Sequence, residues 1–125
     1  MQESQRRYAL LGAVSGALLV IVGAFGAHSL EFAEGREANY ETGVAYHAYH
    51  TLALLAACAL SPLWGGRAVV WAGRLWLAGI VLFSGSLYVL AATDTSWLGA
   101  VTPFGGVAFI AGWVAFAVGI GQTRT

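Results

Sequence analysis

The stretch Gly43–Leu60, G-V-A-Y-H-A-Y-H-T-L-A-L-L-A-A-C-A-L, is long and apolar enough to cross a membrane, although its first half holds two histidines and two tyrosines. Polar ring groups are costly in hydrocarbon unless other helices or water satisfy them. The sequence therefore predicts that the other segments of the chain pack around this one.

The composition indicates an integral membrane protein. Of the 125 residues, 58% are hydrophobic and only 10% are charged, whereas about a quarter of the residues of a soluble domain are charged. The hydrophobic residues fall in four blocks, each near the roughly 20 residues that span a bilayer core. We expect an all-α fold, a single four-helix transmembrane bundle over residues 1–125, with helices at about 8–27, 44–60, 68–92 and 103–120.

The charge balance limits the class of partner. The net charge is zero and the chain contains no lysine. A nucleic-acid partner would require a basic face, so none is expected, and the lipid bilayer is the partner that the composition predicts. Cys58 lies in an apolar run and is interpreted as a small packing residue.

The first apolar block resembles a signal peptide, because Arg6 and Arg7 precede it. Its apolar run, Tyr8–Ala27, is longer than the 7–15 residues typical of a signal peptide, so we expect a retained transmembrane helix. Gly12 and Gly16 have the spacing at which membrane helices approach closely. Glycine-rich faces of this kind predict a homo-oligomer, although glycine is also simply common in membrane helices.

Three connections separate the four blocks. Residues 28–42 are polar and are interpreted as a solvated loop, with a short surface helix as the alternative. Ser61-Pro62 is expected to end the second helix, because the residue before proline disfavours helical geometry. Thr102-Pro103 has the pattern of an N-cap followed by proline in the first turn of the fourth helix.

The arginines predict the orientation of the chain. With four crossings both termini lie on one side of the membrane. That side would hold five of the six arginines and the other side only one, namely Arg6, Arg7, Arg67, Arg74 and Arg124 against Arg36. The positive-inside rule then places both termini in the cytoplasm. The expected location is the bacterial inner membrane.

Polar side chains are predicted to gather in the outer half of the bundle. His47 and His50 are three residues apart and therefore close on the helix surface. Counting residues from the outer boundary of each helix places the following candidates at similar depth: His28, Tyr46, His47, Tyr49, His50, Ser84, Tyr88 and Thr102. Their convergence depends on helix rotation, which the sequence does not fix.

Three interpretations of these residues compete. They could form hydrogen bonds between helices, which are modest in membranes but avoid unsatisfied polar groups. They could line an outward-opening pocket or hydrophilic path for a small ligand. They could bind a metal or haem, since imidazole suits transition metals, although His47 and His50 are too close on one helix to hold opposite faces of a haem. No particular cofactor is implied.

No set of residues predicts catalysis. The chain contains no cysteine pair and no carboxylate inside the apolar blocks, and its serines do not match the nucleophile-elbow pattern. We therefore expect a protein that is not an enzyme and has no catalytic or metal-binding residues. Transport usually needs ionisable groups along the whole path, whereas the inner half of this four-helix bundle is apolar. A continuous pathway would therefore need an oligomer or an unidentified membrane partner.

Several motifs occur in order along nearly the whole chain: G-A-F-G-A-H at 23–28, Y-H-A-Y-H-T-L-A-L at 46–54, L-F-S-G-S-L-Y at 82–88, T-P-F-G-G at 102–106 and G-W at 112–113. Through them the chain resembles the domain-of-unknown-function family 423, small bacterial inner-membrane proteins similar to the transmembrane protein 256 group. The resemblance implies a four-helix membrane protein and no particular activity. His28 and His50 match its motif positions, whereas His47 stands where many members carry glutamine.

The leading hypothesis is a non-enzymatic membrane component, oligomeric or accessory. The alternative is a small-molecule- or metal-binding membrane protein, or a transporter, that uses the outer His/Tyr residues. The direction in which His28 and His50 point distinguishes the two hypotheses.

Overall fold

The fold is described from a computed structural model that covers residues 3–28, 32 and 35–123. Within these residues all regular structure is helical and there is no strand. The elements are α1 (Glu3–His28), α2 (Arg36–Ala59), α3 (Ser61–Trp64), α4 (Gly66–Gly79), the π-helical η1 (Ile80–Ser84), α5 (Gly85–Thr93), the 3₁₀-helical η2 (Ser96–Ala100) and α6 (Thr102–Gly121).

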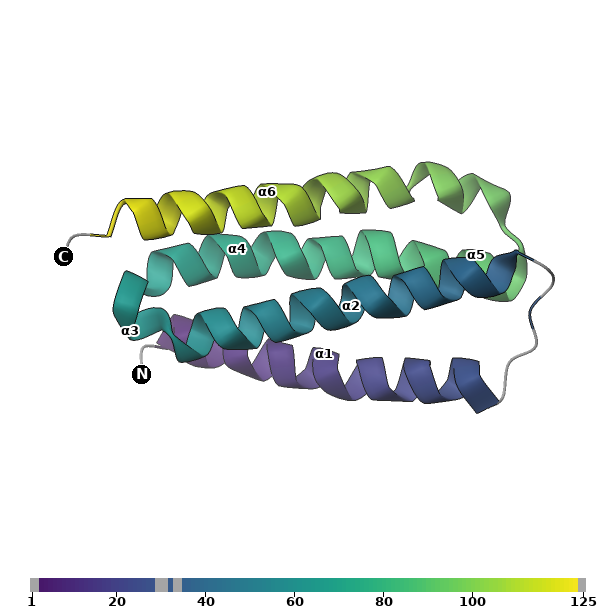
Figure 1. Ribbon diagram of the computed structural model, residues 1–125, viewed down its shortest axis with the longest axis horizontal. Helices are drawn as coiled ribbons and strands as arrows, with labels where there is room; N and C mark the ends of the chain where they lie inside the picture. The colour runs from purple at the N-terminus through teal and green to yellow at the C-terminus, as the bar shows by residue number, and fades with distance from the viewer. Residues whose placement is uncertain (1–2, 29–31, 33–34, 124–125) are drawn as a thin grey trace.

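The long helices lie side by side in one elongated bundle (Figure 1). Helices α4, η1 and α5 follow one another without a break and form one long rod. Helix α1 packs on α2, α6 packs on α4 and η1, and α2 contacts α4, η1 and α5 between them. The start of α1, α3 and the end of α6 share one end of the bundle, here called the terminal end. The start of α2 and η2 share the other, here called the loop end.

Three helical segments are long and apolar enough to cross a membrane: Glu3–Ala27, Gly66–Thr93 and Ser96–Gly121. This agrees with three of the four expected spans. Helix α2 does not reach the same hydropathy, because its uncharged part, residues 42–59, contains His47, His50 and two tyrosines.

Helix α2 begins at Arg36, well before the start expected near residue 44. The interpretation of residues 28–42 as a loop is therefore wrong from Arg36 onward. Gly35, with φ of 88°, provides the left-handed residue that precedes the helix. Glu37 in the first turn then interacts favourably with the positive helix N-terminus.

The turn between α2 and α4 contains an additional short helix. Helix α2 ends at Ala59, close to the end that Ser61-Pro62 predicted. Pro62 occupies the first turn of α3, and Gly65, with φ of 88°, redirects the chain into α4. A non-glycine residue would be strained in that conformation.

Thr102 does not have the predicted role of N-cap. It is the first residue of α6, and its hydroxyl donates to the carbonyl of Leu98 at 3.3 Å. Pro103 does lie in the first turn, as expected.

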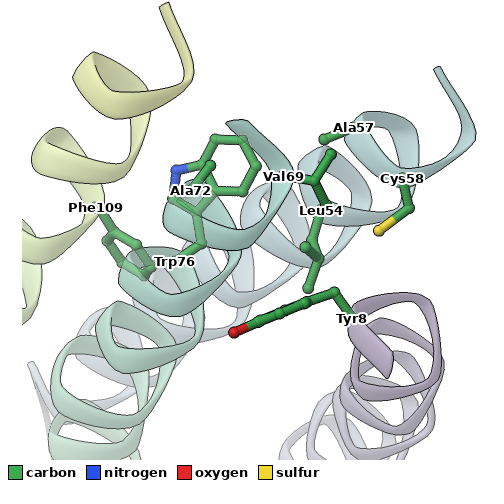
Figure 2. Packing of buried hydrophobic residues seen from close by; sticks show 8 residues of the cluster. All are labelled: Tyr8, Leu54, Ala57, Cys58, Val69, Ala72, Trp76 and Phe109. Carbon is green, nitrogen blue, oxygen red and sulfur yellow. The ribbon is translucent and has the colours of Figure 1, made fainter. Parts of the chain in front are cut away.

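The hydrophobic core lies nearer the terminal end. Trp76, Leu54 and Val69 are fully buried there, together with Ala57, Cys58, Ala72, Phe109 and Tyr8 (Figure 2). Cys58 is 4% exposed, as its interpretation as a packing residue predicts. Gly112 allows this packing, because a Cβ at its position would lie 2.6 Å from the Trp76 indole nitrogen.

Candidate functional site

The predicted polar residues converge on α2 but divide into two separate groups. His47 faces α1 and α5, whereas His50 faces α6. Both histidines are 4% exposed. The side chain of His28 lies outside the described residues, so its predicted place in the cluster is not described here.

His47 is the centre of a hydrogen-bond network that joins three helices. Its Nε2 lies 2.9 Å from Ser15 Oγ and 3.1 Å from the Ser15 carbonyl oxygen on α1. Its Nδ1 lies 2.8 Å from the Tyr88 hydroxyl on α5. Ser15 Oγ is in turn 2.7 Å from Thr51 Oγ1, one turn along α2 from His47. The network therefore fixes the rotation of α1 and α5 relative to α2.

The partners of His47 indicate its tautomer. The carbonyl of Ser15 can only accept a hydrogen bond, so a proton on Nε2 satisfies that contact. Nδ1 then accepts from the Tyr88 hydroxyl. In this arrangement the imidazole is neutral and neither ring nitrogen is free.

His50 is held in an equally defined state. Its Nδ1–H donates to the Tyr46 carbonyl at 2.7 Å, and the indole N–H of Trp113 donates to its Nε2 at 3.1 Å. A carbonyl must accept and an indole must donate, so His50 is the neutral Nδ1–H tautomer. Its ring also stacks on Phe109, with centroids 3.6 Å apart and planes 10° apart. His50 therefore links α2 to α6.

The remaining hydroxyl groups bond the loop end of the bundle together. Ser84, fully buried in η1, donates to the carbonyl of Gly43 on α2 at 2.7 Å. Thr102 lies 2.6 Å from Ser86 Oγ and so connects α6 to α5. Both contacts join different helices, which is the packing role expected for small polar residues in membranes.

Tyr46 and Tyr49 instead line an open groove between α2, η1 and α6. Its volume is about 530 Å³. Tyr46 packs against Phe83, with ring centroids 4.8 Å apart, and is 40% exposed, while Tyr49 is 60% exposed. The groove is mostly apolar and its lining contains no formally charged side chain: Tyr46, Tyr49, His50, Phe83, Gly106, Phe109, Ile110 and Trp113.

The described residues contain no group of three or more His, Cys, Asp or Glu side chains that could hold a metal ion. Metal binding by either ring would require displacing the donor to its unprotonated nitrogen, which is the Tyr88 hydroxyl for His47 and the Trp113 indole for His50. The arrangement is suited to cross-linking helices.

Four members of these networks were not predicted: Ser15, Thr51, Ser86 and Trp113. Weak signals for two of them were present in the sequence. Ser15 adjoins Gly16 on a face of small residues, and Thr51 follows His47 by one helical turn. No pattern indicated that the Trp113 indole would reach His50, since that contact depends on how α6 is rotated.

The sequence is similar to those of several bacterial membrane proteins. It is 49% identical over 114 residues to the UPF0382 membrane protein YwdK of Bacillus subtilis, covering 89% of this chain and 93% of that protein. It is 40% identical over 123 residues to a UPF0382 membrane protein of Haemophilus influenzae, covering 97% and 98%. It is 41% identical over 112 residues to the UPF0382 inner membrane protein YgdD of Escherichia coli, covering 88% and 86%.

No solved structure gives a significant match. The family described as "Protein of unknown function (DUF423)" matches residues 22–106, a range that contains His47 and His50 but not their partners Ser15 and Trp113. The predicted resemblance is thereby confirmed, and the chain belongs to the DUF423 family, whose similar bacterial proteins are named UPF0382 membrane proteins.

Proposed function

We propose that this protein is a non-enzymatic, multi-pass component of the bacterial inner membrane, with an accessory or assembly role. One observation carries the proposal: both ring nitrogens of each buried histidine are bonded to groups of the same chain. A catalytic or transporting imidazole needs a nitrogen that can exchange protons or bind substrate. Here the imidazoles instead join α2 to α1, α5 and α6.

Four crossings are proposed: the three apolar segments and, in addition, α2. Helix α1 leads from the terminal end to the loop end, and α4 starts again at the terminal end. If α1 and α4 each begin a crossing on that side, α2 must cross back between them. Its 24 residues extend about 36 Å, and its polar side chains are bonded to neighbouring helices.

Both termini are proposed to be cytoplasmic. Arg6, Arg7 and Arg67 lie at the terminal end, whereas Arg36 begins α2 at the loop end. The positive-inside rule places the arginine-rich end in the cytoplasm. The name of the Escherichia coli relative, an inner membrane protein, supports the same membrane.

Accessibility labelling tests this orientation. The buried Cys58 is first replaced by alanine, and single cysteines are introduced by Gln122→Cys and Glu37→Cys. A membrane-impermeant maleimide applied to intact spheroplasts should label the Glu37→Cys variant alone. Labelling of the Gln122→Cys variant from outside would reverse the proposed orientation.

Self-association is also proposed, through small-residue faces that remain open. Most close-packing glycines contact another helix of the same chain: Gly12 faces Leu55, and Gly79 faces Phe109. A Cβ at Gly121 would meet no atom within 4 Å, and one at Gly106 would only touch the Phe83 ring at 3.9 Å, so both positions could accept a residue of a second copy. Cross-linking in native membranes, followed by mass determination in mild detergent, tests this proposal, and a strictly monomeric protein in both would refute it.

A second candidate function is the binding of a neutral, lipid-soluble molecule. The groove of about 530 Å³ favours it, because it has aromatic walls, lacks formally charged side chains and exposes two tyrosines. Ile110→Trp would fill the groove. Val107→Trp is the matched control, since Val107 is 65% and Ile110 66% exposed on the same helix but only Ile110 lines the groove.

Gentle purification followed by mass spectrometry distinguishes the two functions. A small molecule that co-purifies with the wild type and the Val107→Trp variant, but not with the Ile110→Trp variant, would establish binding. A ligand-free wild type whose fold also survives His50→Ala would favour the structural role.

A further inference from the structure

A crevice at the terminal end of the bundle has the layout of a phospholipid site. It lies between the start of α4 and the end of α6 and consists of two adjoining hollows of about 440 and 280 Å³. Both hollows are lined by Arg67, Ala68, Gly119 and Gln122, so they form one continuous surface.

Polar and apolar side chains both line the crevice. Arg67 and Gln122 line both hollows, and the outer hollow adds Thr123 together with Pro62, Leu63 and Trp64. One turn farther into the bundle, about 6 Å along each helix, the crevice is lined by Trp71 and Val118. With Arg67 outside these apolar side chains, the order matches that in which a lipid headgroup and its acyl chain follow each other across a membrane surface.

The outer part of the crevice attracts an anion. Arg67 is exposed. Among the described residues it makes no ion pair, and none of their carboxylates lines either hollow. It lies in the first turn of α4, whose N-terminus has no side-chain cap, so free backbone N–H groups and the helix dipole add to its charge. Trp64 also lines this part, and its buried indole N–H has no partner in the part of the chain that the structure describes.

We propose that this crevice binds one anionic phospholipid. Its phosphate lies against Arg67 and the first turn of α4, and one acyl chain runs along Trp71 and Val118. The apolar inner part favours a membrane lipid over a soluble phosphate, because basic pockets between membrane helices suit lipid headgroups. The inference goes beyond the proposed function and does not depend on which side of the membrane the terminal end faces.

Native mass spectrometry of the full chain tests the proposal. The protein is incubated in mild detergent with equimolar phosphatidylglycerol and phosphatidylcholine, and the retained lipid is identified. The wild type should retain phosphatidylglycerol at least about fivefold over phosphatidylcholine, the factor contributed by one basic side chain near an anionic lipid. Arg67→Gln should remove that preference.

Arg7→Gln is the matched control. Arg7 is an exposed arginine at the same end, paired with Glu3 at 3.9 Å and absent from the crevice. This variant should keep the preference of the wild type. Equal losses in the two variants would overturn the proposal, because they would show that the overall charge of the surface, and not the crevice, selects the lipid.

A third variant and a competitor distinguish a lipid from a free anion. Ala115→Leu narrows the apolar part of the crevice and should reduce lipid retention while Arg67 is intact. Excess inorganic phosphate should displace little of the bound lipid. Complete displacement by phosphate, together with unchanged retention in Ala115→Leu, would assign the crevice to a soluble anion and refute the lipid site.

Discussion

Replacing His47 by leucine tests whether the buried imidazoles hold the helices together. The substitution removes the bonds to Ser15 and Tyr88, and an average interhelical hydrogen bond in a membrane contributes about 0.6 kcal/mol. Ser15 keeps its contact with Thr51, so it is not left without a partner. The Tyr88 hydroxyl loses its bond to the imidazole, which adds to the cost. The expected loss is about 1–3 kcal/mol of unfolding free energy.

The measurement is unfolding in mixed micelles with increasing sodium dodecyl sulfate, followed by tryptophan fluorescence. His47→Gln retains a donor and an acceptor and should lose less than His47→Leu. Tyr88→Phe combined with His47→Leu should cost less than the sum of the two single substitutions, by about 0.6 kcal/mol. Tyr49→Phe is the control, because Tyr49 is 60% exposed and should change stability by less than about 0.5 kcal/mol.

An unchanged midpoint for His47→Leu would refute the reasoning. Strict additivity of the His47→Leu and Tyr88→Phe effects would refute it as well, because the hydrogen bond between the two side chains would then contribute nothing. Either result would argue against helix packing as the role of the histidines and would favour the hypothesis that they bind a ligand.

Three further substitutions test the packing. Trp113→Phe leaves His50 Nε2 without its donor and should cost about 0.6–1.7 kcal/mol in the same unfolding assay; no change would mean that the indole bond is unimportant. Gly112→Ala brings a methyl group within 2.6 Å of the Trp76 indole nitrogen and should cost about 1–3 kcal/mol, whereas an unaltered midpoint and fluorescence spectrum would contradict this packing. Gly65→Ala forces a φ of 88° and a ψ of 161° on alanine and should cost about 1–3 kcal/mol, and a stabilised protein would disprove that turn geometry.

Hydropathy predicted the lightly buried helices α1 and α6 better than α2, which contacts α1, α4, η1 and α5. The 18-residue apolar windows of α1 and α6 are only 11% and 17% buried inside the bundle, so lipid contact dominates their composition. Helix α2 begins with Arg36, Glu37 and Glu41, which resemble a solvated loop in sequence. Residue spacing alone could not reveal that these residues continue a helix.

The sequence predicted a similar depth for the polar residues but left open whether they converge. His47 and His50 are three positions apart, which separates them by about 60° around the helix axis. Because α2 contacts α1, α4, η1 and α5, that angle is sufficient for the two rings to meet different helices. The division into two groups depends on helix rotation, and rotation is set by contacts such as that of Gly43 with Tyr88, which appear only in three dimensions.

The same contacts would allow α2 to cross a membrane, as proposed above, although its hydropathy is low. A polar side chain disfavours insertion only while its donors and acceptors lack partners. In α2 the imidazoles of His47 and His50 receive their partners from α1, α5 and α6, and Ser84 of η1 bonds to the Gly43 carbonyl. In the proposed topology, α2 therefore depends on the other helices for its place in the bilayer. His47 and His50 lower the hydropathy of α2, and the same two residues fix which helices pack against it.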